Sequence, residues 1–177
     1  LTRHYGYLRN YESTISQFVT LGHKVHIAAD REEMLGGREM VERWTREHSG
    51  VTMGWTPDRE ADHWLWVATR LRLAQDFLRY QDPNYDRAPQ LRLRAEERIP
   101  TTVLALLNLL GYRTKPIRRL MEFALNLLER AAPLSKALCD YLSEQEPDVV
   151  LITPLIELGS PQLDHLRAAR KLGLRTA

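Results

Sequence analysis

The first thirty residues constrain the fold more than any other stretch of the chain. They read as a polar loop, a helix with one apolar face, a glycine turn, and a short apolar run that ends at Asp30. Asn10 is a favourable N-cap residue for this helix, and Gly22 ends it because glycine adopts a left-handed conformation at little cost. Residues 25–29 then read as a strand. This order of elements predicts the second half of a β-α-β unit.

The two ends of the sequence suggest that it is part of a longer protein. Only Leu1 and Thr2 precede the first loop, and the chain begins without methionine. At the other end, Gly173 closes a helix, and residues 174–177 resemble the beginning of a strand. We therefore expect a first strand that is missing or barely represented, and a fragment of a larger parent.

The rest of the chain alternates between strands and helices, with one long interruption. A helix is expected over 38–48 and a strand over 51–55, and the apolar run 147–154 is typical of a strand buried on both faces. No strand is expected in the predominantly helical stretch 58–146. The predicted class is α/β: a Rossmann-like parallel sheet flanked by helices, forming a single domain over 1–177, with an all-helical insert at about 58–146.

Composition excludes several classes of protein. The chain is 44% hydrophobic and 27% charged, with a net charge of +2, which is far from a nucleic-acid-binding signature. Its one cysteine, Cys139, excludes an internal disulfide framework. No apolar run reaches transmembrane length, and we expect no signal peptide. We expect a cytoplasmic protein, peripheral membrane contact being the alternative, and no nucleic-acid partner.

Ligands of open α/β sheets bind beyond the carboxyl ends of the strands, which directs attention first to the loop 3–10. His4 is a candidate general base because its ordinary pKa lies near neutrality, and Gly6 permits close approach of the backbone to a ligand. Arg9 is a candidate for binding an anion or for pairing with Glu12. The substrate-binding candidates in this loop are Gly6, Tyr7, Arg9 and Asn10. A surface loop with stacked tyrosines is the structural alternative.

The loop 153–160 is the second candidate. Thr153, Gly159 and Ser160 are its substrate-binding candidates, since free N–H groups at a helix start favour anions and hydroxyls. Glu157 is a candidate catalytic residue that accepts a proton or a sugar hydroxyl. A capping serine beside a solvated glutamate is the alternative reading.

Nucleotide and metal sites are not expected in this chain. Asp30 ends a strand where an acid holds ribose in dinucleotide sites, but the first loop lacks the glycine pattern that such sites need. Gly36 and Gly37 precede a helix and could offer N–H groups to an anion, but a plain turn is the favoured explanation. The histidines show no metal-ligand spacing. We therefore expect neither a cofactor nor a metal in this domain.

The expected helical insert carries two further signals. Residues 64–80 have apolar positions on two sides, and arginines cluster in 92–98 and 113–119. Basic amphipathic helices bind anionic membrane surfaces, whereas a solvated face over a packed core is the commoner explanation.

Two segments resemble GT-B glycosyltransferases. The pattern N-x-E-S-x-I…F-x-x-L-G-H-K-V-H-I-A, over 10–28, is similar to the start of these enzymes, in which "GH-x-V" joins the first helix to the second strand. The run E-P-D-V-V-L-I-T-P, over 146–154, resembles a later strand of the same family. In many inverting members a histidine follows the loop glycine and a proline comes three residues later. Tyr7 and Asn10 occupy those positions here, which leaves His4 as the substitute base and leaves the inverting and retaining mechanisms both open.

The resemblance implies the acceptor-binding N-terminal domain of a glycosyltransferase. In that family a C-terminal domain binds the nucleotide-sugar donor, so the implied partners are this absent domain and a sugar acceptor, which is a small molecule, a glycan or a lipid. The segment alone is then expected to be inactive. The alternative from another class is a non-catalytic α/β module whose helical insert binds a protein partner or a membrane surface.

Overall fold

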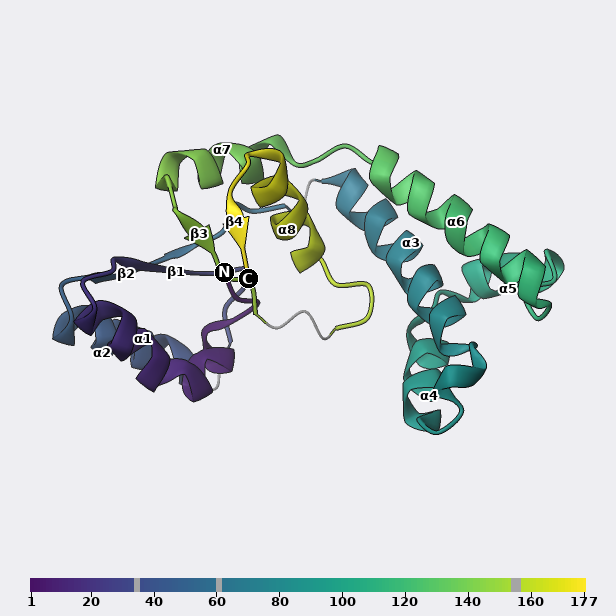
Figure 1. The fold of residues 1–177 in the computed structure, drawn as a ribbon, viewed down its shortest axis with the longest axis horizontal. Coiled ribbons are helices and arrows are strands. Elements are labelled where there is room, and N and C mark those ends of the chain that lie inside the picture. Colours follow the sequence, from purple (N-terminus) through teal and green to yellow (C-terminus); the bar gives the residue numbers. More distant parts are fainter. Residues whose placement is uncertain (34–35, 60–61, 154–156) are drawn as a thin grey trace. The chain divides into compact units, whose positions relative to one another are not determined.

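The computed structural model describes residues 1–33, 36–59, 62–153 and 157–177, and the chain divides into two compact units (Figure 1). The α/β unit comprises Leu1–Arg59, Leu134–Leu155 and Gln162–Ala177. The helical unit comprises Glu60–Pro133 and Ile156–Pro161. The predicted α/β class is confirmed, because parallel strands alternate with helices in the first unit.

Strands β1 (Val25–Ala29) and β2 (Val51–Trp55) form a parallel pair in the α/β unit. Val25 pairs with Val51 at one end of the register and Ala29 pairs with Trp55 at the other. Both strands match the predicted ranges. Because they are parallel, the residues that follow Ala29 and Trp55 leave the sheet at the same edge.

A second parallel pair joins β3 (Val149–Val150) to β4 (Arg175–Thr176). The strand predicted over 147–154 is thus shorter than expected, although hydrogen bonding continues past it. Ala177 N–H donates to the Val150 carbonyl at 3.1 Å, and Ile152 N–H donates to the Ala177 carbonyl at 3.0 Å.

The segment Leu1–Arg3 connects the two parallel pairs. Thr2, which is 1% exposed, forms parallel bridges to both Ala29 and Thr153. Its N–H donates to the Ala28 carbonyl at 2.9 Å, and Thr153 N–H donates to the Leu1 carbonyl at 3.0 Å on the other side. The chain therefore runs directly from the middle of this strand arrangement into the first candidate loop.

The helices on one face of β1 and β2 are η1 (Tyr5–Tyr11), α1 (Glu12–Thr20) and α2 (Gly37–Glu47). Their apolar residues form one core with the strands, made of Tyr5, Leu8, Ile15, Ile27, Ala29, Val41, Trp44 and Val51. The predicted cap at Asn10 is wrong. The chain is already helical from Tyr5, and the residue before α1 is Tyr11, whose side chain makes no capping hydrogen bond.

Helices α7 (Lys136–Gln145) and α8 (Gln162–Lys171) pack against β3 in a separate core of the same unit. In β1, His26 points away from the first core, because successive strand residues face opposite sides. Its Nε2 lies 2.9 Å from the Tyr141 hydroxyl of α7. The α/β unit therefore has helices on both faces of β1.

The helical unit contains α3 (His63–Tyr80), η2 (Pro83–Tyr85), α4 (Pro89–Arg98), α5 (Thr101–Leu109) and α6 (Lys115–Ala131). No strand occurs among its described residues, as predicted. Its core includes Phe77 and Leu78 of α3, Leu107 of α5 and Tyr112. Arg72, only 2% exposed, ties α3 to α6 through a 2.7 Å ion pair with Glu129. No helix among the described residues has both the length and the apolarity needed to cross a bilayer.

Candidate functional site

The loop that follows Leu1–Arg3 brings a histidine and a glutamate together. His4 has an extended backbone, and its ring stacks on Tyr7 with the centroids 4.2 Å apart. His4 and Glu33 both lie beside Gly6. A Cβ added to Gly6 would be 3.2 Å from His4 Nδ1 and 3.2 Å from Glu33 Oε2. Sequence spacing did not identify Glu33 as a partner, since Glu33 follows β1 and lies outside the loop 3–10. His4, Gly6 and Tyr7 of the predicted site are therefore neighbours.

His4 is held in the form that a general base needs. The pKa of His4 is lowered, chiefly by burial of the ring. The nearby charges of Arg31 and Arg3 also lower this pKa, whereas the Glu33 charge raises it. The imidazole is therefore neutral at pH 7 and able to accept a proton. Its Nδ1 is buried and has no hydrogen-bond partner in the described part of the chain.

Acidification is expected to destabilise the α/β unit through His4 and His26. Burial lowers the pKa of both below the ordinary value of 6.5, so the unfolded chain binds more protons than the folded one just below that pH. The stability that these neutral rings contribute is present above pH 6.5 and is lost as the pH falls through their lowered pKa values. An NMR titration of the histidine C2 protons should give both residues a pKa below 6.5, and a value above 6.5 for either ring would contradict this expectation.

The paired glycines before α2 do not leave an open anion site. Gly36 adopts a left-handed φ of 76°, which turns the chain into the helix. Gly37 N–H then donates to Glu33 Oε1 at 2.6 Å. A carboxylate of the chain itself thus occupies the positive end of α2, where an external anion would otherwise bind.

A second polar group lies where β1 and β2 end. Asp30 Oδ1 accepts a hydrogen bond from the Thr56 hydroxyl at 2.9 Å and lies 2.9 Å from His165 Nε2. His165 comes from α8 and is only 2% exposed. Sequence reasoning treated His165 as isolated, because the residue that it approaches is distant along the chain and no local pattern joins them.

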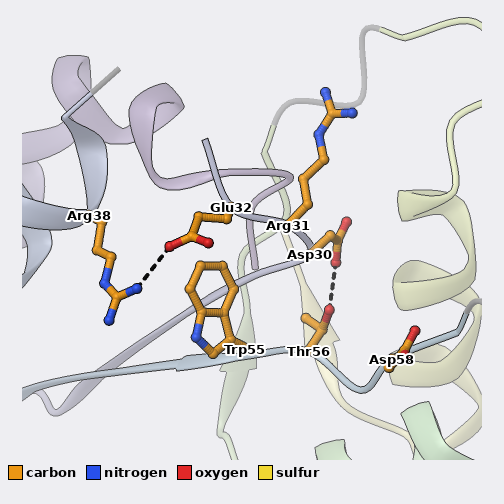
Figure 2. A pocket seen from close by; sticks show the side chains of 7 residues that line it. All are labelled: Asp30, Arg31, Glu32, Arg38, Trp55, Thr56 and Asp58. Carbon is orange, nitrogen blue, oxygen red and sulfur yellow. Dashed lines mark hydrogen bonds and ion pairs between the residues drawn. The ribbon is translucent and has the colours of Figure 1, made fainter. Parts of the chain in front are cut away.

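Asp30 and Thr56 also line a surface pocket of about 340 Å³ (Figure 2). The Trp55 indole lies between the Asp30–Thr56 pair and an ion pair of Arg38 with Glu32 (Figure 2). The full lining is Asp30, Arg31, Glu32, Arg38, Trp55, Thr56 and Asp58.

The polar groups of this pocket are held in position by neighbouring residues. Trp55 is 40% exposed, and Tyr5 packs against it with ring centroids 5.0 Å apart. The Tyr5 hydroxyl donates to the Gly54 carbonyl, and burial raises the pKa of Tyr5 to about 12, so it remains a donor. Arg38 contacts Glu32 at 2.8 Å and Glu42 at 2.9 Å, which neutralises its charge.

The charges of the pocket favour a neutral, hydroxyl-rich ligand. Its lining has three carboxylates against two guanidinium groups, and one of these, Arg38, already has two carboxylate partners. A phosphate or carboxylate ligand would therefore meet a net negative surface. A flat aromatic ring with carboxylate acceptors around it suits a ligand with one apolar face and many hydroxyl donors.

The remaining predicted residues of the α/β unit lie nearby or face solvent. The Tyr11 and Thr153 hydroxyls are 3.4 Å apart, which connects the first loop to the end of the β3 segment. Gln162 Nε2 donates to the Thr153 carbonyl at 3.0 Å. Arg9 and Asn10 are exposed. Glu12 bonds Arg43 and Trp44 rather than supporting the predicted pair with Arg9.

Residues 157–161 belong to the helical unit, and residues 154–156 of the predicted loop lie outside the described part of the chain. Gly159 N–H donates to Asp76 Oδ2 of α3 at 2.9 Å, and burial raises the pKa of Asp76. The Ser160 carbonyl accepts a 2.9 Å hydrogen bond from Arg72. Both residues are buried, whereas Glu157 is half-buried. The predicted ligand-binding N–H of Gly159 is therefore already used by Asp76.

Among the described residues, no group of three or more His, Cys, Asp or Glu side chains is placed to hold a metal ion. Comparisons with protein-family models, with curated proteins and with solved structures gave no match to this chain.

Proposed function

We propose that this chain is the acceptor-binding domain of a GT-B glycosyltransferase, which moves a sugar from a nucleotide-sugar donor to a hydroxyl acceptor. The observation that carries the proposal is the position of Leu1–Arg3 between the two parallel pairs. It gives the spatial order β2, β1, Leu1–Arg3, β3 and β4, with helices on both faces of β1. We infer a single Rossmann-like sheet from this order.

The order supports a binding site at one edge of the sheet. From Leu1–Arg3 the chain passes through η1 and α1 to β1, which lies on one side of Leu1–Arg3. The β3 segment lies on the other side. Loops diverge at such a switch point, and ligands of open α/β sheets bind there. His4 follows the central segment and Thr153 follows β3, and the Tyr11–Thr153 contact links the two. The Trp55 pocket lies at the same edge, beyond β1 and β2.

The proposed chemistry gives each neighbouring residue one role. The acceptor hydroxyl oxygen forms a bond to the anomeric carbon of the donor while the bond from that carbon to the nucleoside diphosphate breaks. Neutral His4 takes the hydroxyl proton, and Glu33 stabilises the resulting imidazolium. The pocket beside Trp55 binds the apolar face and the hydroxyl groups of the acceptor. Donor binding and the departing diphosphate are assigned to a further domain of the parent protein.

The test is nucleoside diphosphate release by the complete parental protein with a panel of sugar donors and acceptors. We expect acceptor-dependent release, reduced on the order of 100-fold or more in kcat by His4→Gln. His23→Gln is the matched control, because His23 is an exposed histidine of the same unit and should leave the rate unchanged. Folded parental protein that releases no diphosphate with any donor would overturn the proposal.

A non-catalytic module is the second candidate, supported by the exposed apolar residues of α6. Parental protein that releases no diphosphate but still binds a partner or a membrane through α6 would favour this second candidate over sugar transfer.

A further inference from the structure

The outward side of α6 carries large apolar side chains that nothing covers within the described chain. Leu120 is 67% exposed, Phe123 66%, Leu127 59% and Leu128 56%. Together with Ile117, these residues define the α6 face. From Ile117 to Leu127 they recur every three or four positions, so they form one stripe along the helix, and Leu128 widens its end. Single exposed leucines are ordinary, but a stripe of this kind marks an interaction surface.

Exposed apolar side chains also occur at the end of α5, the helix before α6. Leu109 of α5 is 84% exposed and the following Leu110 is 52% exposed. No charged residue occurs in α5. A Cβ on Gly111 would lie 3.6 Å from Ile117 Cδ1, so the turn between the helices lies directly beside the start of the α6 face.

The charges near the start of α6 are mostly basic. Arg113, Lys115 and Arg119 are exposed and have no ion-pair partner in the described part of the chain. The acidic residues between 101 and 131 are Glu122, whose side chain is 35% exposed, and Glu129, whose side chain is 16% exposed. Glu129 pairs with the buried Arg72 at 2.7 Å, and Glu122 lies 4.0 Å from Arg118, which is 7% exposed. The acids are thus used inside the unit, and the bases remain outside.

We propose that the α6 face docks this protein onto an anionic membrane surface. A helix with large apolar residues on one side and basic residues near its start lies in the interface, with the apolar side among the acyl chains and the cations at the lipid headgroups. The α6 helix is too short and too polar to cross the bilayer. A second copy of the chain is a poorer occupant, because it would bring the same basic residues against each other. The inference does not depend on the proposed sugar transfer.

The test is co-sedimentation of the 177-residue chain with vesicles of phosphatidylcholine alone and of equal parts phosphatidylcholine and phosphatidylglycerol. We expect binding to the anionic vesicles, weak binding to the neutral ones, and weakening by salt. Replacing Leu120, Phe123 and Leu127 together by Gln should lower the affinity on the order of 100-fold. These side chains are exposed, so circular dichroism of the variant should match that of the wild type.

Two matched controls make the test specific. Leu21→Gln replaces an equally exposed leucine of the α/β unit, at 67%, and should bind as the wild type does. Lys115→Glu with Arg119→Glu should weaken binding by about 25-fold or more, roughly fivefold for each lost charge. Lys24→Glu with Lys171→Glu makes the same change in net charge elsewhere and should retain most of the binding.

Three results would overturn the proposal. The first is a wild-type chain that ignores anionic vesicles, and the second is a triple Gln variant that binds them undiminished. The third is a dimer in light scattering that the triple Gln variant converts to a monomer, since the occupant of the α6 face would then be a second copy.

Discussion

Replacing Gly37 by alanine is expected to lower the free energy of unfolding of the α/β unit by about 3 kcal/mol. Gly37 begins α2 with its Cα against the backbone of Tyr5 and Gly6. A Cβ there would overlap the Gly6 nitrogen, the Tyr5 carbonyl carbon and a carboxylate oxygen of Glu33. Backbone atoms cannot rotate away as a side chain can, so α2 or η1 must shift.

The sign of this effect is informative because alanine ordinarily stabilises a helix relative to glycine. Destabilisation therefore reports the close approach of α2 to η1, which also holds Glu33 beside His4. Gly50→Ala is the control, since its Cβ would meet only the His23 carbonyl at 3.4 Å and Val19 at 3.5 Å. Urea unfolding monitored by hydrogen exchange of the β1 amides measures the stability of the α/β unit separately from that of the helical unit. A Gly37→Ala protein as stable as the wild type would show that the two segments do not pack in this way.

Much of the α/β unit could be predicted because its signals are local. The apolar runs at Val25–Ala29 and Val51–Trp55 specify strands, and both form at the predicted residues. Gly22 adopts the expected positive φ, at 86°, and ends the first helix region. The Asn10 prediction failed because a good capping residue acts only where the chain enters a helix, and here the helical turn starts at Tyr5.

The site itself depends on contacts that no sequence pattern encodes. Glu33 approaches Gly6 and His165 approaches Asp30 only after distant segments have packed. The capping serine considered at Ser160 carried no sign that Gly159 packs on α3, where a Cβ would lie 2.8 Å from Leu73. The hydrogen bond that half-buried Asp76 accepts from the Gly159 N–H is visible only in three dimensions.

Trp55→Ala is expected to lower the affinity of the pocket at the end of β2 for a carbohydrate by about tenfold or more. This is the order of effect expected from the loss of one stacked aromatic contact. The indole is 40% exposed and is held by Tyr5, so it offers a fixed flat surface to the apolar face of a sugar ring. Asp30 is fixed by Thr56 and lies at the edge of that surface (Figure 2). Its Oδ2 is buried and has no hydrogen-bond partner among the described residues.

Two further variants separate lost stacking from a damaged fold. Trp55→Phe keeps a flat ring against Tyr5 and should retain most of the binding. Trp66→Ala removes a more exposed tryptophan, at 59%, from the helical unit, where Arg70 stacks on it, and should bind as the wild type does.

We propose that the carboxyl edge of the α/β unit holds a neutral sugar acceptor, and saturation-transfer NMR of the 177-residue chain with a panel of neutral and anionic glycans measures this directly. We expect transfer to the ring protons of a neutral glycan that disappears in Trp55→Ala and persists in Trp55→Phe and Trp66→Ala. Transfer to no glycan in the panel, or transfer that is unchanged in a folded Trp55→Ala protein, would contradict the claim.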